Sequence, residues 1–338
     1  MKEYKIGSNE KGQRFDKLLA KILSNANKGF IYKMLRKKNI TLNGKKATGN
    51  EILNQDDIVK IFLSDETFEK FSKGSVMLEE NVSSSVKLEI IAETKDYIII
   101  NKPVGMLSQK ADNKDVSLVE HLIKYMIETN QITKEQLLTF RPGICNRLDR
   151  NTSGIVIGGK SLIGLQKMTE YIKERKVDKY YLAFVKGKVT KKEKINGYLI
   201  KDEANNKVTV SKECYNGSNK KDGKMECIET EYEPLCSNDH YTLLKVKLIT
   251  GKTHQIRAHL ASINHPIVGD YKYGDRKTNE YFKKNYGVES QLLHAYQLIF
   301  RNNDEDRLEL KNKEFKASPN KIFMKVINDT DNEYINVI

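Results

Sequence analysis

The sequence RPGICNRLDRNTSG, residues 141–154, leads directly into the apolar segment IVIG, residues 155–158. The first segment is rich in turn-forming residues, whereas the second consists mainly of β-branched residues that favour a buried strand. Asp149 lies between Arg147 and Arg150, and nearby guanidinium groups favour the charged form of a carboxylate. The sequence here predicts either a nucleophilic carboxylate at the entrance to a core strand or a structural cluster of Arg–Asp ion pairs.

Arginine is scarce in this chain, which contains 10 arginines and 49 lysines. Lysine therefore supplies most of the positive charge, and an arginine is expected where a planar, two-armed donor is needed. Three of the ten arginines fall within residues 141–150: Arg141, Arg147 and Arg150. This concentration singles out the segment as a candidate functional site.

The overlapping sequence GIVIGGKS, residues 154–161, matches the phosphate-loop pattern GxxxxGK[ST]. Such a loop has to wrap its amides around phosphates, but Ile155, Val156 and Ile157 prefer an extended, buried strand. The polar sequence RLDRNTS precedes the pattern, where a phosphate loop would follow a strand. We therefore predict a strand here and keep a nucleotide hydrolase only as an alternative, which an ATP-binding assay would test.

The rest of the chain after residue 86 reads as strands with interspersed helices. Strands are expected over 86–94, 96–103, 155–158, 178–187, 207–213, 225–233, 241–250, 292–300 and 306–311. Helices are expected over 117–128, over 161–176 and from about Thr253, with an irregular loop at 265–274. Strands and helices do not alternate regularly, so the pattern predicts an α+β fold whose sheet is largely antiparallel.

The first part of the chain carries a concentrated positive charge. Residues 1–63 have a net charge of +8, whereas the full 338-residue chain has +14. Residues 14–38 read as two short helices, Asn43-Gly44 as a hairpin turn and 56–63 as a strand. A small basic module suits binding to a polyanion, although a lysine-rich surface that aids solubility is an equal alternative.

The length and punctuation of the chain predict two domains. Residues 64–85 have no periodicity and end in a serine run, which is typical of a linker. We therefore expect an N-terminal domain at 1–66, a linker at 67–85 and a larger domain at 86–338.

Several segments resemble the RluA-type RNA pseudouridine synthases. RLDRNTSG is similar to the RLDRxTSG signature of that family, and KYYLA, residues 179–183, is similar to its KxYxA strand. GKTHQIRAH, residues 251–259, resembles the G(R/K)THQIRxH helix of the family, and LHA, residues 293–295, its LHA strand. Over residues 12–63 the chain also resembles the S4 RNA-binding domain. The overall resemblance is greatest to the bacterial large-subunit rRNA enzymes RluC and RluD.

The resemblance implies that the chain isomerises uridines in RNA with Asp149 as the nucleophile, together with Tyr181 and Arg257. Arg257 would form a two-armed pair with Asp149, and Tyr181 would stack on the uracil. The substrate-binding residues implied are Arg147, which fills the space of the flipped uridine, and Arg150, Thr152, His254, Gln255 and Leu293. Those implied to bind RNA are Arg14, Lys28, Lys33, Arg36, Lys37, Lys38, Lys45 and Lys46. Asn146 departs from the family, many of whose members have histidine there.

Isomerisation involves no redox step or phosphate transfer, so no cofactor is expected. The spacing of His254, His259 and His265 does not suit a helical zinc site, and the four cysteines form no CxxC pair, so no metal is expected. The expected partner is RNA, either rRNA or a pre-ribosomal particle. No apolar run is long enough to span a membrane, and we expect a cytoplasmic monomer. The remaining alternative is a non-catalytic, ribosome-associated RNA binder.

Overall fold

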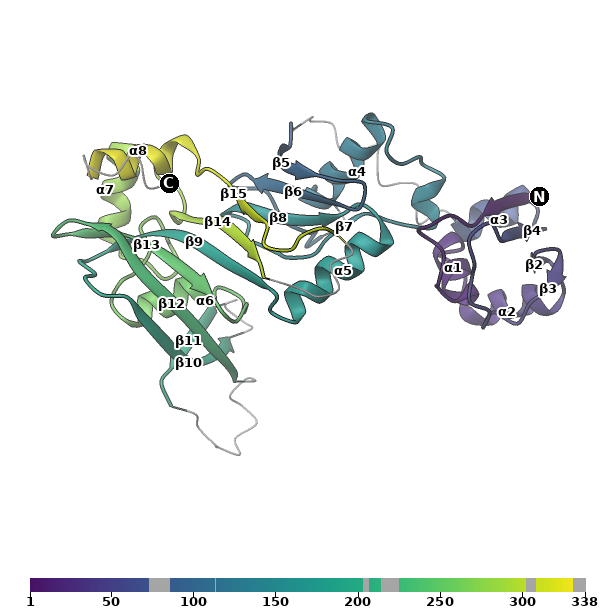
Figure 1. The fold of residues 1–338 in the computed structure, drawn as a ribbon, viewed down its shortest axis with the longest axis horizontal. Coiled ribbons are helices and arrows are strands. Elements are labelled where there is room, and N and C mark those ends of the chain that lie inside the picture. The colour runs from purple at the N-terminus through teal and green to yellow at the C-terminus, as the bar shows by residue number, and fades with distance from the viewer. Residues whose placement is uncertain (73–85, 113, 203–206, 214–224, 302–307, 331–338) are drawn as a thin grey trace.

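The computed structural model describes residues 1–72, 86–112, 114–202, 207–213, 225–301 and 308–330 (Figure 1). An N-terminal module, residues 1–72, lies at one end of an elongated molecule and has a hydrophobic core of its own. The rest of the described chain, here called the body, is built on one large sheet.

The N-terminal module combines helices with a four-stranded antiparallel sheet in the order β1-β4-β2-β3. Its elements are β1 (Lys2–Lys5), α1 (Phe15–Ile22), α2 (Lys28–Arg36), β2 (Ile40–Leu42), β3 (Lys45–Lys46) and β4 (Ile58–Ile61). The helices and the 56–63 strand confirm the prediction. Asn43 and Gly44 both have positive φ, +51° and +72°, as a tight hairpin between β2 and β3 requires.

The prediction of an irregular linker from residue 64 is wrong for its first part, which forms helix α3 (Asp65–Ser72). Phe68 is buried in the core of the N-terminal module, and the Phe71 ring lies 4.2 Å from that of Phe30. Two aromatic residues over two helical turns are too short a pattern to reveal a helix in the sequence. The module therefore extends to residue 72, and residues 73–85 lie outside the described part of the chain.

The body contains an eleven-stranded sheet, of which nine strands follow the order β11-β10-β12-β13-β9-β14-β8-β6-β5. β15 pairs with β14 and β7 with β8 outside this order. The strands are β5 (Glu89–Glu93), β6 (Tyr97–Lys102), β7 (Gly143–Ile144), β8 (Ser153–Gly159), β9 (Val177–Lys186), β10 (Glu193–Asp202), β11 (Lys207–Ser211), β12 (Glu226–Ser237), β13 (Tyr241–Leu248), β14 (Leu293–Phe300) and β15 (Glu314–Lys316).

Among the described pairs, β8 and β14 are the only parallel neighbours. This confirms a mixed, largely antiparallel sheet in an α+β fold. β8 also confirms that GIVIGGKS is a strand, since every residue of Ser153–Gly159 is buried. The Lys160 ammonium of that pattern is bonded to the carbonyl of Thr94 and to Glu93.

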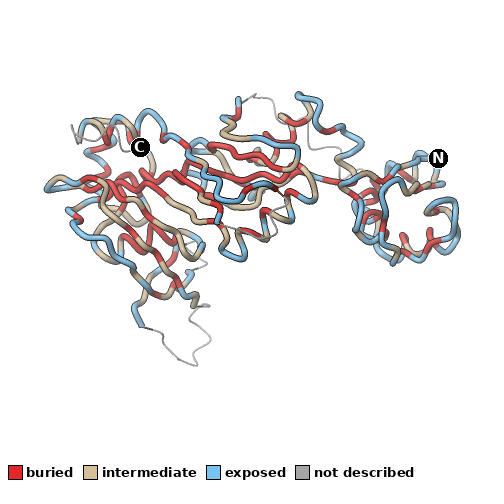
Figure 2. Tube along the Cα trace, in the orientation of Figure 1, coloured by how far each residue is buried: buried red, intermediate tan, exposed pale blue. Residues whose placement is uncertain are grey.

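Helices pack on both faces of the sheet, and the alternation along its strands separates the two cores. On β9, Tyr181 and Ala183 face one core while Leu182 and Phe184 face the other. The central strands are buried along most of their length (Figure 2). The helices are α4 (Leu118–Glu128), the short 3-10 turn η1 (Gln136–Leu138), α5 (Leu162–Lys173), α6 (Gln255–Ser262), α7 (Arg276–Tyr286) and α8 (Lys321–Thr330). α4 and α6 lie over the Tyr181 face, whereas α7 and α8 cover the Phe184 face.

The expected strand at 306–311 is wrong for the described residues of that range. Leu308 and Leu310 are buried, but Glu309 and Asn312 have φ values of +54° and +58°, which break an extended chain. The edge of β14 is paired instead by β15. The sequence also gave no prediction of β10, α7 or α8.

Within the residues that the structure describes, two hydrogen bonds join the N-terminal module to the body. The Thr139 hydroxyl donates to Glu10 at 2.6 Å, and the Leu162 amide donates to Asn9 at 3.1 Å. No described helix is both long and apolar enough to cross a membrane.

Candidate active site

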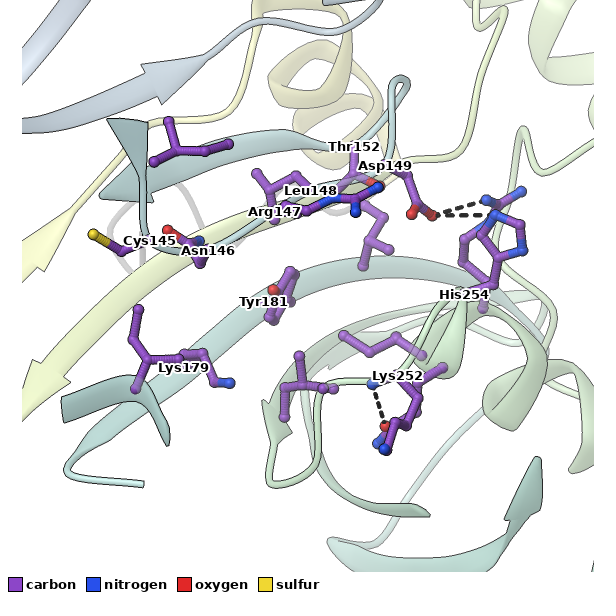
Figure 3. A pocket seen from close by; sticks show the side chains of 18 of the residues that line it. Cys145, Asn146, Arg147, Leu148, Asp149, Thr152, Lys179, Tyr181, Lys252 and His254 are labelled. Atoms are coloured by element: carbon purple, nitrogen blue, oxygen red, sulfur yellow. Dashed lines mark hydrogen bonds and ion pairs between the residues drawn. The ribbon is translucent and has the colours of Figure 1, made fainter. Parts of the chain in front are cut away.

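A pocket of about 420 Å³ opens on the Tyr181 face of the sheet (Figure 3). This volume falls within the range of pockets that hold one small ligand. The lining comes from the loop between β7 and β8, from β9, from the segment before and within α6, and from the start of β14. Segments far apart in the chain therefore meet at one site.

The loop that carries Asp149 is fixed on both sides by hydrogen bonds. Ser108 donates to the Leu148 carbonyl at 2.8 Å and accepts from the Leu148 amide at 3.0 Å. The fully buried Lys102 ammonium donates to the Arg150 carbonyl at 3.1 Å, and the Gly105 amide donates to the same oxygen at 3.0 Å. Asp149 is thus held between two anchored neighbours.

Small residues are required at Ser153 and Gly154, because β14 packs closely against this part of β8. A Cβ on Gly154, whose φ is +111°, would lie 2.3 Å from the Ala295 carbonyl oxygen, so the close approach of β14 requires glycine. The Ser153 hydroxyl lies 2.8 Å from Nδ1 of His294, and Nε2 of that ring lies 2.9 Å from the Ala317 carbonyl. The ring therefore accepts from Ser153 and donates to Ala317, which ties β8 to β14 next to the pocket.

Arg257 and Asp149, 108 residues apart, form an ion pair at the pocket. Nη1 of Arg257 donates to Oδ2 of Asp149 at 2.9 Å. The predicted pairing is confirmed, but its predicted two-armed geometry is wrong. Arg257 forms its two-armed bond with Asp270 instead: Nε donates to Oδ2 at 2.7 Å and Nη2 donates to Oδ1 at 2.9 Å. Asp270 is fully buried and holds the guanidinium so that its remaining arm points at Asp149.

Burial and charge act against each other in this cluster. Burial alone would lower the pKa of Arg257, but the hydrogen bonds and charges of Asp270 and Asp149 raise that pKa above its ordinary value. Burial likewise opposes ionisation of Asp270, yet the bonds from Arg257 lower the pKa of Asp270. Burial lowers the pKa of Lys102 to about 7, while the charge of Asp149 acts in the opposite direction. The site therefore keeps an ionised Arg–Asp pair directly beneath Asp149.

Tyr181 lies on the pocket side of β9, and Figure 3 shows its ring between the Asp149 loop and the segment of His254. Burial, followed by the charge of Asp149, raises the pKa of Tyr181, so its hydroxyl stays protonated. Tyr180 is absent from the pocket lining, and its ring lies under the ammonium groups of Lys245 and Lys247 instead. This confirms the expectation that the two tyrosines face opposite sides.

The predicted substrate-binding residues are only partly gathered at the pocket. Arg147, Thr152, His254, Gln255 and Leu293 line it, and Arg147 is exposed at its rim. Arg150 is not part of the lining, because its Nε donates to the Gly105 carbonyl at 3.1 Å. Arg141, flagged with it in the sequence, pairs with Glu120.

Gln255 and Asn146 anchor segments of the pocket through hydrogen bonds of their side-chain amides. The Gln255 amide donates to the Glu229 carbonyl and to Thr230, and its oxygen accepts from Lys252 and Thr250, which anchors the start of α6. The Asn146 amide donates to the Ile155 carbonyl at 3.1 Å and accepts from the Ile157 amide at 2.8 Å. Asparagine can donate and accept at once, so at this position it clamps the loop to β8.

Of the predicted RNA-binding residues, seven are exposed and form no ion pair within the described chain: Lys28, Lys33, Arg36, Lys37, Lys38, Lys45 and Lys46. They lie along and after α2 and on β3. Arg14 differs from them, because its guanidinium is bonded to Asp16 and Asn50. Its charge is therefore compensated within the N-terminal module.

No pattern in the sequence singled out Asp270, Tyr273 or Lys102. Tyr273 lies against both Arg257 and His254, and Asp270 holds the arginine fork. The segment 265–274 was expected to be a loop, and an acidic residue in a loop carries no signal of burial. Among the described residues, no group of three or more histidine, cysteine or acidic side chains is arranged to hold a metal ion.

Comparison with known proteins places this geometry in a family. Residues 96–262 match the family model for RNA pseudouridylate synthase. The chain is 31% identical over 296 residues to ribosomal large subunit pseudouridine synthase C of Vibrio parahaemolyticus, covering 87% of each protein. It is 32% identical over 240 residues to ribosomal large subunit pseudouridine synthase D of Borreliella burgdorferi, covering 70% of this chain and 68% of that protein.

A solved structure shares the fold. Human RNA pseudouridylate synthase domain containing 4 aligns with a TM-score of 0.56 at 22% identity, covering 71% of this chain and 92% of the human one. The match of sequence extends over most of the chain and includes every segment that lines the pocket. The chain therefore belongs to the RNA pseudouridylate synthase family, the enzymes that isomerise uridine in RNA to pseudouridine.

Proposed function

We propose that this enzyme modifies specific uridines of large-subunit ribosomal RNA and that Asp149 is its nucleophile. The observation that carries the assignment is the Asp149 carboxylate itself, which faces the pocket, is 29% exposed and is held by Arg257 at 2.9 Å. The ribosomal substrate rests on the names of the synthases C and D to which the chain is similar.

The proposed reaction uses the Asp149 carboxylate, and it needs no reactive group from outside the chain. The N1–C1′ bond of uridine breaks, the uracil turns and a C5–C1′ bond forms; C5 then loses its proton and N1 gains one, so the product is an isomer of the substrate. The ionised Asp149 carboxylate attacks either C1′ of the sugar or C6 of the uracil, and either adduct releases the carboxylate again. The ion pair with Arg257 holds the attacking group in place throughout.

The residues around Asp149 suit a flipped nucleotide. Taking a uridine out of its stack costs a few kcal/mol, and a guanidinium can stack in the space that the base leaves. Arg147, exposed at the rim, has this role in the proposal. In the proposal the ring of Tyr181, which lines the pocket, stacks on the uracil, and its hydroxyl lies near the C5 proton that must leave.

The N-terminal module serves as an S4-like RNA-binding domain in this proposal. Its seven exposed basic residues on α2, after it and on β3 bind phosphates, which adds affinity without reading sequence. The enzyme acts as a monomer in the cytoplasm, where its ribosomal substrate is assembled.

The test of the nucleophile is Asp149→Asn, which keeps the size of the side chain but removes the charge. Release of tritium from RNA labelled at C5 of uridine should fall at least about 1,000-fold, since an amide is a poor nucleophile. The matched control Asp239→Asn, at a position 83% exposed, should retain the full rate. Turnover of the Asp149→Asn enzyme within tenfold of wild type would remove Asp149 from this role.

The substrate is identified by mapping pseudouridines in a strain that lacks the gene. Loss of defined sites in the large-subunit rRNA, restored by the wild-type gene and not by the Asp149→Asn gene, is the expected result. Loss confined to transfer RNA would contradict the ribosomal assignment and leave the catalytic assignment intact.

A further inference from the structure

The ring of His254 lies between Tyr273 and Asp149. Nδ1 of His254 is 3.0 Å from the Tyr273 hydroxyl, and Nε2 is 3.8 Å from Oδ2 of Asp149. The two rings meet edge to face, with centroids 5.6 Å apart. Figure 3 shows the His254 ring directed at the carboxylate of Asp149. Nη1 of Arg257 pairs with the same carboxylate oxygen, Oδ2.

The hydrogen bonds of Tyr273 determine where the histidine proton is. The Val208 amide donates to the Tyr273 oxygen at 3.0 Å, so that oxygen is already an acceptor. Burial raises the pKa of Tyr273, and the hydroxyl therefore keeps a proton to donate. Nδ1 of His254 is the acceptor within reach, which leaves the single proton of a neutral ring on Nε2, facing Asp149.

The surroundings of His254 favour the neutral ring. Burial is the largest influence and lowers the pKa of His254, and the positive charges of Arg257 and Lys272 act in the same direction. The charges of Asp149 and Asp270 oppose this shift only in part. A neutral Nε2–H, 3.8 Å from Oδ2 and so beyond hydrogen-bond length, directs its dipole at the nucleophile without adding a second positive charge.

The backbone of His254 has a strained conformation, and this conformation accompanies the contact of its ring with Tyr273. The residue precedes α6 with φ +53° and ψ +17°, in the left-handed region that side chains other than asparagine, aspartate and histidine rarely adopt. Such a conformation is strained and persists only where the surroundings hold it. The Tyr273 hydroxyl bond is one such constraint.

We propose that His254 is a positioning residue for the nucleophile, with Tyr273 fixing its tautomer so that Nε2–H is directed at Oδ2 of Asp149. Arg257 meets the same oxygen, and no described residue hydrogen-bonds Oδ1. The hydrogen bond from Arg257 and the nearby His254 N–H both engage Oδ2, which leaves Oδ1 as the oxygen that attacks the uridine. The proposal rests on the assignment of Asp149 as the nucleophile.

The tautomer is measured directly by NMR of the full-length enzyme labelled with ¹⁵N-histidine. We expect an unprotonated Nδ1 and a protonated Nε2 for His254, identified by the signal that His254→Gln removes. Tyr273→Phe should change this signal, whereas Tyr281→Phe, at a position 53% exposed, should not. A proton on Nδ1 in the wild-type enzyme would overturn the proposal.

Two substitutions separate the donor from the backbone. The amide of glutamine can take the place of Nε2, whereas the shorter asparagine cannot reach Asp149 but tolerates the left-handed backbone better. His254→Gln should therefore keep the single-turnover rate within about tenfold of wild type, and His254→Asn should lose about 10- to 100-fold more. The dissociation constant for RNA should change little in either variant.

Equal rates for the two variants, or a faster asparagine variant, would show that the position serves only the backbone turn, and the proposal would then be wrong. His240→Gln, at an exposed position, is the control for a change of ring to amide. The NMR signal does not depend on whether Asp149 attacks the substrate. An active Asp149→Asn enzyme with the expected tautomer would therefore reject the nucleophile and not the hydrogen-bond arrangement.

Discussion

Arg257 directs both arms of its guanidinium fork at Asp270, with Nε and Nη2 donating to the two carboxylate oxygens at 2.7 and 2.9 Å. Only Nη1 remains, and it points at Asp149. The arginine is therefore a bridge between a buried structural carboxylate and the one that faces the pocket. This arrangement explains why an arginine is needed in a chain whose positive charge comes mostly from lysine.

Arg257→Lys should reduce the single-turnover rate of uridine isomerisation by about 100-fold or more. A single ammonium cannot donate two parallel bonds to Asp270 and a third to Asp149 from the place of Nη1. The measurement is tritium release with enzyme in excess over RNA. The control is Arg276→Lys on α7, whose side chain is 89% exposed and whose rate should be unchanged. A near-normal rate for the Arg257→Lys enzyme would mean that charge alone is sufficient.

Tyr181→Phe should leave RNA affinity within about threefold and lower the rate by about 100-fold, since it keeps the stacking ring and loses the hydroxyl that the proposal places beside the departing C5 proton. Affinity is measured by filter binding and the rate by single-turnover tritium release. Tyr180→Phe, on the opposite side of β9, should have the wild-type rate. If both variants are fully active, the ring of Tyr181 is sufficient and the hydroxyl takes no part.

Replacement of Lys33, Arg36 and Lys37 by glutamine should weaken RNA binding and make its salt dependence shallower. If these three exposed residues contact three phosphates, the log–log slope should change by roughly 2 to 3 units through lost counterion release. The rate at saturating RNA should stay near wild type, because every residue of the pocket lies beyond residue 108.

The matched control replaces Lys277, Lys283 and Lys284 on α7 by glutamine, which also removes three exposed charges. Its salt slope should equal that of wild type. Equal slopes for all three proteins would show that the basic surface of α2 serves solubility. Deletion of residues 1–72, the whole N-terminal module, should produce at least as large a change of slope as the triple variant.

Stability should fall as the solution is acidified from about pH 7 to about pH 5, with a contribution from His294. Burial lowers the pKa of His294 to about 4 from 6.5. Between these values the unfolded chain binds a proton that the folded one does not, so the free energy of unfolding falls as pH falls, by about 2 kcal/mol for this residue. Burial lowers the pKa of His259 to about 4 as well, with the same sign.

Urea unfolding of the wild-type enzyme and of His294→Gln at both pH values measures this contribution. The variant should be less stable at neutral pH, because it loses the bonds to Ser153 and Ala317, but its stability should depend less on pH. An undiminished pH dependence in the variant would show that His294 is not a source of the acid sensitivity.

Local sequence was sufficient for the elements whose pattern is strong. The β-branched run after Gly154 specified a buried strand, the Asn43-Gly44 pair specified a hairpin, and the alternating segments specified β9, β12 and β13. Local sequence was insufficient where the structure of a segment depends on a turn or on packing against a distant part of the chain. α3 forms because Phe68 and Phe71 find the N-terminal core, and 308–311 turns because Glu309 and Asn312 adopt positive φ.

The sequence by itself determined which residue types occupy the site, because each of the motifs around Asp149, Tyr181 and Arg257 is a continuous stretch of the chain. The tertiary structure alone decided their partners. The grip of Asp270 on Arg257, the hydroxyl of Tyr273 on His254 and the position of Arg150 outside the pocket depend on distances between segments brought together by the sheet. Hydrogen bonds act over about 3 Å, and no pattern of residues along one chain specifies separations of that size across a fold.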